Sequence, residues 1–411
     1  MGLELLWLLG CVGMDSVLSA TVDVDPPASS PGEPAPVPVP PRPYPTVSFN
    51  ARGAPLGVDG EPGAELFAAG SIHDLAITLS DDAWRSLRDD PREEVRGTVT
   101  WRTVEYDAGI RLKGSSSFRT IDEKCSFKID VHAFEDARRI DGLKRLTLNN
   151  QIQDPTMARE HAYYWLAASV GVPGSRHGYA RVTVNGEAYG LYGLVETMDE
   201  RLLDRLFPDD DKGNLYESSG ADFTDARNWF DLEEEGGVVP APDDLDDLID
   251  ALEDADGDAY VDVMRERFDM DALLGYLALD LVTGNDDGYV FNHHNYHAYH
   301  LAFADRWVLL PWGTDRSFTR EVSPYGGGLT PIVGVLATRC WDDEACADAL
   351  TERIVDVLDV WEGPFRDHVG DTLARVSEAC EDDPKREKSC DPDDLAAFVD
   401  RRAEYVRDAL E

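Results

Sequence analysis

The stretch GNDDGYVFNHHNYHAYH, residues 284–300, gathers side chains that suit three kinds of chemistry. Its four histidines suggest a transition-metal site, its aspartates an acidic surface loop, and its Asp and Asn residues the catalytic loop of a phosphoryl-transfer enzyme. Read as a strand, the segment places His293 and His297 on one face and His294 and His300 on the other, because side chains alternate along a strand. Histidines divided between two faces do not converge on one metal, so the transition-metal interpretation is disfavoured.

Phosphoryl transfer needs a carboxylate that accepts the proton of the attacking hydroxyl, and an amide oxygen and a second carboxylate that hold Mg²⁺ on the phosphates. Asp287, Asn295 and Asp315 occur in that order. Asp315 directly follows an apolar run in LLPWGTDRSF, where a carboxylate leaves the edge of a predicted sheet. We therefore predict a catalytic aspartate at 287 and metal ligands at 295 and 315. Asp286 is expected to point elsewhere and to tolerate replacement by Asn.

The elements that must position these residues divide the chain into a β-rich half and an α-rich half. Residues 71–130 largely alternate apolar and polar side chains, as strands do, and contain the serine-rich turn GSSSF at 114–118. The dipeptide Asn185-Gly186 between two alternating runs predicts a hairpin. Residues 268–282 predict an apolar helix that leads into the loop, and helical patterns dominate the rest of the chain.

One predicted helix carries a carboxylate on its apolar side. In DPTMAREHAYYWLAASVG, Asp154 is the predicted N-cap, Pro155 the first helical residue and Gly171 the residue just past the end. Glu160 shares a stripe with apolar residues of this helix. A glutamate on the core-facing stripe needs a buried cation, which the lysine-bearing strand upstream can provide.

The N-terminal region has the features of a leader followed by a tether. Residues 1–20 begin MGLELLWLLGCVGMDS, in which LLGC resembles the site where bacterial lipoproteins are cleaved and acylated, so Cys11 is a candidate for lipidation, although Glu4 stands where a cationic region is expected. Residues 21–46 are rich in proline and predict an extended linker. The folded body is expected at 47–411, and the protein is expected to be exported, lipid-anchored at the cell envelope or secreted.

The other five cysteines agree with export. Cys340 and Cys346 bracket one polar turn, Cys380 and Cys390 bracket another, and a disulfide can close each. Cys125 is left over and is expected to be a buried thiol.

The charge of the chain excludes one class of partner. Acidic residues outnumber basic ones 81 to 38, giving a formal net charge of −43. Nucleic acids and anionic membranes are bound through clustered Lys and Arg, so neither is an expected partner, apart from a membrane contact through the lipid anchor.

Seven blocks, in order, resemble the CotH kinase family, named for spore coat protein H. They are IRLKGSSSF, KCSFKID, LTLNNQIQDPTMAREHAYYWL, VNGEAYGLYGLVETMDERLL, GNLYE, GNDDGYVFNHHNY and LLPWGTDRSF, within residues 70–320. The resemblance implies an α+β, atypical bilobal protein-kinase-like fold, with a β-rich lobe at about 65–200 and an α-rich lobe at about 201–411. It also implies transfer of the γ-phosphoryl group of ATP, with Mg²⁺, to Ser or Thr of surface or coat proteins.

Residue by residue, the resemblance implies that Asp287 is the catalytic aspartate and that Asn295 and Asp315 bind the metal. Lys128 in SFKI would contact the nucleotide phosphates, with Glu160 as its ion-pair partner.

Three further positions follow from the same resemblance. Lys113 and Lys124 are rival candidates for the phosphate-binding lysine. The serine-rich turn would lie over the phosphates, and Glu196, at the exit of a strand, would lie near the adenine.

One position departs from the family pattern. The family's Pro-Trp-Asp-x-Asp is here PWGTD, so Gly313 stands in place of a carboxylate. If that carboxylate is a metal ligand, Mg²⁺ affinity falls, and the protein is either weakly active or a pseudokinase, that is, a non-catalytic surface or coat binding module. If Asp315 is the ligand, activity is retained. Mg²⁺-dependent nucleotide binding separates the two hypotheses.

Overall fold

A computed structural model of the chain describes residues 61–224, 227–326 and 331–411. They all belong to one compact unit. The predicted leader, its Cys11 and the proline-rich linker lie outside the described residues. None of the helices within the described ranges is long and apolar enough to cross a membrane.

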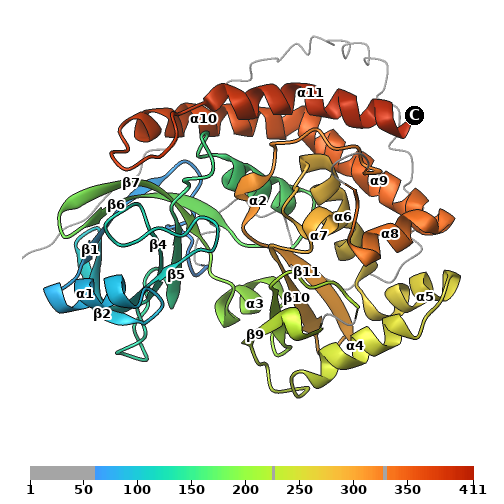
Figure 1. Ribbon diagram of the computed structural model, residues 1–411, viewed down its shortest axis with the longest axis horizontal. Coiled ribbons are helices and arrows are strands. Elements are labelled where there is room, and N and C mark those ends of the chain that lie inside the picture. Colours follow the sequence, from blue (N-terminus) through green and yellow to red (C-terminus); the bar gives the residue numbers. More distant parts are fainter. Residues whose placement is uncertain (1–60, 225–226, 327–330) are drawn as a thin grey trace, which may run out of the picture. The chain divides into compact units, whose positions relative to one another are not determined.

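The first half of the described chain is a closed barrel of seven strands (Figure 1). Their order around the barrel is β1-β2-β3-β4-β5-β7-β6, and every neighbouring pair is antiparallel except β1 with β6. The strands are β1 (Ile72–Thr78), β2 (Val95–Trp101), β3 (Val104–Lys113), β4 (Ser126–Asp130), β5 (Arg145–Asn149), β6 (His177–Val184) and β7 (Glu187–Val195). The β-rich character agrees with the sequence, but closure into a barrel was not part of the prediction.

Local sequence signals account for several barrel connections. Asn185 and Gly186 both have positive φ (49° and 82°), as a two-residue hairpin between β6 and β7 requires. Helix α1 (Asp81–Asp89) begins after Ser80, whose hydroxyl accepts a hydrogen bond from the amide of Ala83. The alternating apolar side chains of the strands meet in a buried cluster inside the barrel.

Helix α2 (Arg159–Ser169) starts four residues later than the sequence predicts. The predicted N-cap, Asp154, accepts hydrogen bonds from the amides of Thr156, Ala158 and Arg159, so its carboxylate closes a turn before the helix begins. The helix therefore cannot include Pro155. At its other end Gly171 has φ +77°, as predicted for the residue past the helix.

The second half combines a four-stranded sheet with helices. The sheet has the order β11-β10-β8-β9. Its strands are β8 (Leu215–Ser218), β9 (Phe230–Glu234), β10 (Tyr296–Leu301) and β11 (Arg306–Pro311). The larger helices are α3 (Glu200–Leu206), α4 (Asp243–Glu253), α5 (Asp258–Arg267), α6 (Met270–Thr283), α8 (Val335–Asp342), α9 (Glu344–Val360), α10 (Arg366–Glu381) and α11 (Pro392–Leu410), and the short α7 spans Tyr289–Asn292.

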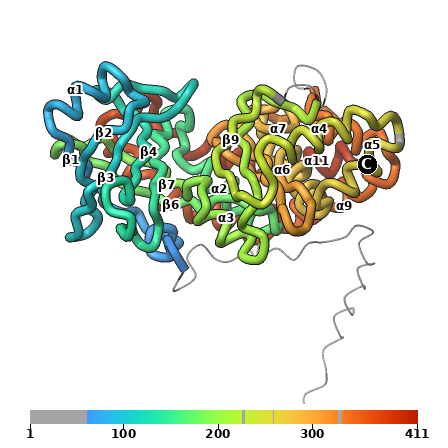
Figure 2. Tube along the Cα trace, turned by 90° about the horizontal axis from the view of Figure 1, so that it is seen from below, coloured from blue at the N-terminus to red at the C-terminus, as the bar shows by residue number. Residues whose placement is uncertain are grey.

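Helix α6 is the predicted apolar helix, and nearly every residue of it is buried. It packs on α9, β11, α7 and α11. In Figure 2, β1 to β4 group together in the barrel, whereas α4, α6 and α7 group around the second half of the chain. The chain is thus a mixed α+β protein, and the 284–300 loop begins where α6 ends.

Candidate active site

Six of the residues singled out from the sequence line one cavity of about 300 Å³. They come from segments far apart in the chain, in the barrel, in α2 and in the loops of the second sheet. These six are Lys113, Lys128, Glu160, Asp287, Asn295 and Asp315. We call this cavity the cleft.

The cleft is lined by opposite charges from the two halves of the chain. The barrel and its loops contribute cations, and the second sheet and its loops contribute carboxylates. The cations are Arg92, Arg111, Lys113 and Lys128, and the carboxylates are Glu217, Glu233, Asp287 and Asp315. A polyphosphate fits the first group, and a cation or a donating hydroxyl fits the second.

Buried polar contacts order the loop that carries Asp287. Gly284 ends α6 in the left-handed conformation. Asp280 of α6 accepts hydrogen bonds from Tyr163 (2.7 Å) and from the side-chain amide of Asn285 (2.9 Å). A side chain at Gly288 would collide with this pair, lying 2.6 Å from Asp280 Oδ2. The loop is therefore packed tightly against α6 just before and after Asp287.

Asn295 links this loop to the segment of Asp315. Its side-chain Nδ2 donates to the carbonyl of Asp287 (2.9 Å), and its own carbonyl accepts from the amide of Trp312 (3.1 Å). Its Oδ1 faces Gly313, since a Cβ there would lie only 2.8 Å away. Asn295 and Gly313 both have positive φ (54° and 56°). The glycine in PWGTD therefore leaves room for the amide oxygen of Asn295.

Two carboxyls of the cleft are hard to ionise. Burial, reinforced by repulsion from Asp315, raises the pKa of Glu160 to about 7. Burial, reinforced by Asp154 and Asp287, raises the pKa of Asp315 to about 6. Negative charge here is only partly compensated, so a bound cation would favour the ionised forms.

Lys113 is the lysine most closely coupled to Glu160. Burial lowers the pKa of Lys113 to about 8, and Glu160 is the largest influence in the opposite direction. Asn149 connects the two side chains, because its Oδ1 accepts from Lys113 Nζ (2.7 Å) and its Nδ2 donates to both oxygens of Glu160 (3.0 Å each). The sequence analysis does not identify Asn149 as a site residue. The only feature that could have indicated its role is that it is a polar residue at the end of a buried strand.

The three candidate lysines, Lys113, Lys124 and Lys128, differ in their positions and contacts. Lys113 and Lys128 both line the cleft, and within the described part of the chain neither forms an ion pair with Glu160, but Lys113 is linked to it through Asn149. Lys124 lies elsewhere: its side chain is 1% exposed and pairs with Asp383. The structure therefore favours Lys113 rather than Lys128 as the partner of Glu160, and it gives Lys124 a structural contact.

Glu196 lies outside the group that lines the cleft. Its carboxylate is 3% exposed and forms ion pairs with Arg176 and Arg205, both at 2.6 Å. Burial alone would raise the pKa of Glu196, but Arg205 and Arg176 outweigh it and hold the pKa at about 2. The next two residues, Thr197 and Met198, line the cleft instead.

The serine-rich loop, residues 114–118, also lines the cleft and is held at several points. Arg92 donates to the carbonyls of Leu112 and Gly114. Gln153 donates to the hydroxyl of Ser116 (2.9 Å), and Asn150 donates to the carbonyl of Ser117 (2.9 Å).

Asp286 does not have the indifferent role expected for it. Its side chain is 3% exposed and pairs with Arg320 (2.7 Å) and Arg316 (3.3 Å), which follow Asp315 in the chain. Asp286 thus ties the loop of Asp287 to the segment of Asp315. Its replacement by Asn is no longer a suitable control.

Three of the four histidines of the loop have separate surroundings, so they do not converge on one metal. The strand β10 begins only at Tyr296, after a short helix, so His293 and His294 are not strand residues. His293 contacts Asp222 (3.1 Å), His300 contacts Asp244 (3.0 Å) and stacks on Trp307, and His297 lines the cleft.

A magnesium ion fits the cleft as a ligand that arrives with a nucleotide. Nowhere in the described residues do three His, Cys, Asp or Glu side chains gather to hold a metal by themselves. Mg²⁺, however, keeps several waters and is commonly bound by one or two carboxylates and phosphate oxygens. The oxygens of Asp315 and Asn295 supply such donors, and a bound cation would offset the burial and the repulsion from Asp154 and Asp287 that raise the pKa of Asp315.

Both predicted cysteine pairs are disulfides in the structure. Cys340 is bonded to Cys346 and Cys380 to Cys390, whereas Cys125 is a buried free thiol. The first disulfide lies in the core of the helical half, and the second closes the loop between α10 and α11.

Comparison with known proteins agrees with the motifs. Residues 110–407 match the family model described as CotH kinase protein. Inner spore coat protein H of Bacillus subtilis (strain 168) is 24% identical over 200 residues, which cover 46% of this chain and 54% of that protein. The chain thus spans about half the length of this curated relative. Because the family model matches more than half of the chain, and extends well past the last motif, the protein belongs to the CotH kinase family.

Proposed function

We propose that the protein is a kinase that transfers the γ-phosphoryl group of ATP to a Ser or Thr hydroxyl of a coat or surface protein. One observation carries the proposal: Lys113, Asp287 and Asp315, which are far apart in the sequence, line the same cleft, together with Lys128, Glu160 and Asn295. In this proposal the barrel half and the α-rich half act as the two lobes of an atypical kinase-like fold. The family and the coat protein relative support the reaction class and the kind of substrate.

Each side chain has a role that its surroundings support. Lys113 and Lys128 bind phosphate oxygens from the barrel side, and the serine-rich loop covers them. Glu160 holds Lys113 in place through Asn149. Mg²⁺, held by Asp315 and the amide oxygen of Asn295, would neutralise charge on the phosphates.

Asp287 is the group that would accept the proton of the attacking hydroxyl. It is partly exposed in the cleft, and its Oδ1 accepts a hydrogen bond from Asn292 (2.8 Å), which fixes the carboxylate. Its position on the carboxylate side leaves the cationic side free for the phosphates.

Gly313 supports a second candidate, a non-catalytic binding module. It replaces a carboxylate of the family pattern. The presence of both Asn295 and Asp315 in the cleft supports the kinase instead, because these are the two metal ligands that the family resemblance implies, and Gly313 leaves room for the amide oxygen of Asn295.

The test combines ATP affinity, measured by calorimetry with Mg²⁺, with phosphate incorporation into a Ser/Thr-containing coat protein. We expect Asp287→Asn to lower phosphate incorporation by at least about 1,000-fold while ATP affinity changes less than about threefold. Asp315→Asn should weaken Mg²⁺-dependent ATP binding by about tenfold or more. Asp408→Asn, at an exposed aspartate of α11, is the control. Absence of ATP binding by the wild type would eliminate the kinase in favour of the binding module.

The location remains a proposal of the same kind. A coat or envelope position agrees with the relative and with two disulfides. Lipid anchoring through Cys11 would fix the protein at that surface.

A further inference from the structure

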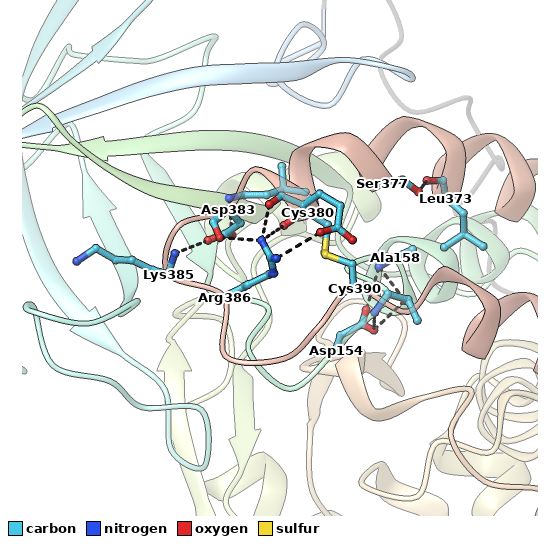
Figure 3. Close-up of a disulfide and its surroundings, with 12 residues drawn as sticks. Asp154, Ala158, Leu373, Ser377, Cys380, Asp383, Lys385, Arg386 and Cys390 are labelled. Carbon is cyan, nitrogen blue, oxygen red and sulfur yellow. Dashed lines mark hydrogen bonds and ion pairs between the residues drawn. A yellow bond between two sulfur atoms is a disulfide. The ribbon is translucent and has the colours of Figure 1, made fainter.

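We propose that the loop closed by the Cys380–Cys390 disulfide is a redox-controlled latch on the cleft. This loop, residues 380–391, is called the strap. It connects α10 to α11 and lies against the barrel (Figure 3). The inference rests on the proposed function, since it assigns the cleft a nucleotide, and it adds a means of regulation to it.

The strap is anchored in the barrel by a buried ion pair. Asp383 is fully buried and pairs with Lys124, which is 1% exposed. The same carboxylate accepts from the amide of Leu191 in β7 (2.9 Å). Gly190 has φ +101°, and any side chain there would collide with Asp383. The barrel surface is therefore shaped to receive this aspartate.

The next residues of the strap contact the segment that follows the serine-rich loop. Glu387 pairs with Arg119, and Arg119 also donates to the carbonyl of Phe118 (2.7 Å). Lys385 donates to the carbonyl of Asp122 (3.1 Å). Together with Lys124, these contacts hold residues 118–124 from the side of the strap.

A second set of contacts joins the strap to residues 153–155, the segment before α2, of which Gln153 lines the cleft. Lys388 donates to the carbonyl of Gln153 (2.6 Å), whose side chain in turn donates to Ser116. The amide of Asp391 donates to the carbonyl of Pro155 (2.9 Å). In Figure 3, Asp154 lies beside Cys390, which agrees with these contacts. The strap therefore contacts the segment after the serine-rich loop directly, and it supports the loop itself through Arg119 and Gln153.

The disulfide decides whether the strap keeps this shape. It closes a ring over a sequence separation of 10. The loop-closure entropy for a ring of this length corresponds to a factor of about 100 in an opening equilibrium. Reduction would therefore release the restraint that holds Asp383, Glu387 and Lys388 in register with their partners.

The two disulfides differ in their exposure to a reductant, so the Cys380–Cys390 bond should be reduced before the Cys340–Cys346 bond. Cys390 is half-buried, whereas Cys340 and Cys346 are both fully buried. A thiolate of a dithiol reductant can attack Cys390 Sγ. The S–S bond breaks, the Cys380 sulfur leaves and takes up a proton, and the second thiol of the reductant displaces Cys390. Two electrons and two protons pass to the strap, and the reductant becomes a disulfide.

The remaining thiol does not interfere with this exchange. Cys125 is 0% exposed, and burial raises the pKa of its thiol far above the ordinary range. It is therefore a poor nucleophile toward the strap disulfide.

The test uses the full chain, oxidised and after treatment with dithiothreitol under native conditions. Alkylation followed by peptide mapping should label Cys380 and Cys390 and leave Cys340 and Cys346 unlabelled. Amide hydrogen exchange in residues 114–124 should rise by at least about tenfold, whereas exchange in α6 stays unchanged. The Kd for ATP with Mg²⁺ should rise by about tenfold.

Two variants make the result independent of the reductant. Cys380→Ser with Cys390→Ser should reproduce the reduced state and should no longer respond to dithiothreitol. Glu387→Gln keeps the disulfide and breaks only the pair with Arg119, so exchange in 114–124 should rise by a smaller factor.

The outcomes separate this inference from the proposed function. If labelling shows that Cys380 and Cys390 are reduced but exchange in 114–124 and ATP affinity stay the same, the latch is refuted and the kinase stands. Resistance of this disulfide to dithiothreitol in the native protein would also refute it. If the oxidised protein binds no ATP, the proposed function fails, and with it the regulatory role of the strap.

Discussion

Replacing Glu160 by Gln should stabilise the nucleotide-free protein at pH 8. The side chain is 1% exposed, and burial, followed by repulsion from Asp315, raises its pKa from 4.5 to about 7. A carboxyl whose pKa is higher in the folded than in the unfolded chain stabilises the fold below about pH 4.5, and this stabilisation is lost as the pH rises through about 7. At pH 8 the ionised Glu160 therefore weakens the fold.

The size of the effect follows from the shift. A rise from 4.5 to about 7 corresponds to about 3 kcal/mol at 1.36 kcal/mol per pKa unit. The attraction to Lys113 is already contained in this shift. Glutamine, however, can accept from Asn149 Nδ2 through only one of the two atoms that now accept from it, and this loss leaves a net gain of about 2 kcal/mol. For a folded unit of this size that raises Tm by about 3 °C. At pH 4.5 the difference between variant and wild type should disappear.

Glu196→Gln is a matched control that should change the free energy of unfolding at pH 8 in the opposite direction. Glu196 is also buried, at 3% exposure, but the cations of Arg205 and Arg176 overcome the effect of burial and lower its pKa to about 2. Its stabilisation is present above about pH 4.5 and is lost as the pH falls through about 2. Glutamine there leaves the buried guanidinium of Arg176 and the partly buried one of Arg205 without their anion, which costs about 3–5 kcal/mol at pH 8.

Thermal unfolding of both variants at pH 8 and pH 4.5 measures the contrast. The reasoning fails if Glu160→Gln lowers Tm at pH 8 as Glu196→Gln does, because Glu160 would then be a structural carboxylate. The same Glu160→Gln protein should bind ATP with Mg²⁺ more weakly. Greater stability with weaker binding is the combination expected where a group is kept for function.

Two further predictions concern the ligands of the cleft. Gly313→Asp, which restores the family's carboxylate, should weaken Mg²⁺-dependent ATP binding, because its Cβ would lie 2.8 Å from Asn295 Oδ1. Gly313→Ala should weaken binding similarly, because it adds the same Cβ. Tighter binding by the Asp variant would contradict the proposal that Asn295 Oδ1 needs this space. The association rate of ATP, measured by stopped flow, should rise when salt increases from 10 to 150 mM. The net charge of −43 repels the nucleotide, and the Debye length over which it acts shrinks from about 30 to about 8 Å. A falling rate would mean that the cations of the cleft dominate at long range.

The parts of the fold that the sequence predicts are those with local causes. The Asn185-Gly186 hairpin follows from two residues that accept positive φ, and α6 follows from an apolar run closed by Gly284. Closure of the barrel depends on β1 pairing with β6, over 100 residues away, and no short pattern encodes that register. The sequence predicts too early a start for α2, because Asp154 caps the turn that precedes the helix.

In the candidate site, too, the sequence predicts some features and not others. The types and order of Asp287, Asn295 and Asp315 are visible in the sequence, since the chemistry needs them. What holds them is not visible: the pair between Asp286 and Arg320, and the bridge through Asn149, join residues more than 30 positions apart. For the same reason the choice between Lys113 and Lys128 as partner of Glu160 required the structure.

The distribution of charge distinguishes the cleft from the rest of this acidic chain. Most of the 81 acidic residues can be solvated at little cost, and many of the buried ones have cationic partners, as Glu196 does. In the cleft, burial and then Asp315 raise the pKa of Glu160, and burial, Asp154 and Asp287 raise that of Asp315, although Lys113 acts on both in the opposite direction. A fold selected only for stability would separate these carboxylates or give each a guanidinium. Their persistence beside four cations of the barrel half is explained if the missing charges arrive together, as a polyphosphate for the cations and a divalent metal for the carboxylates.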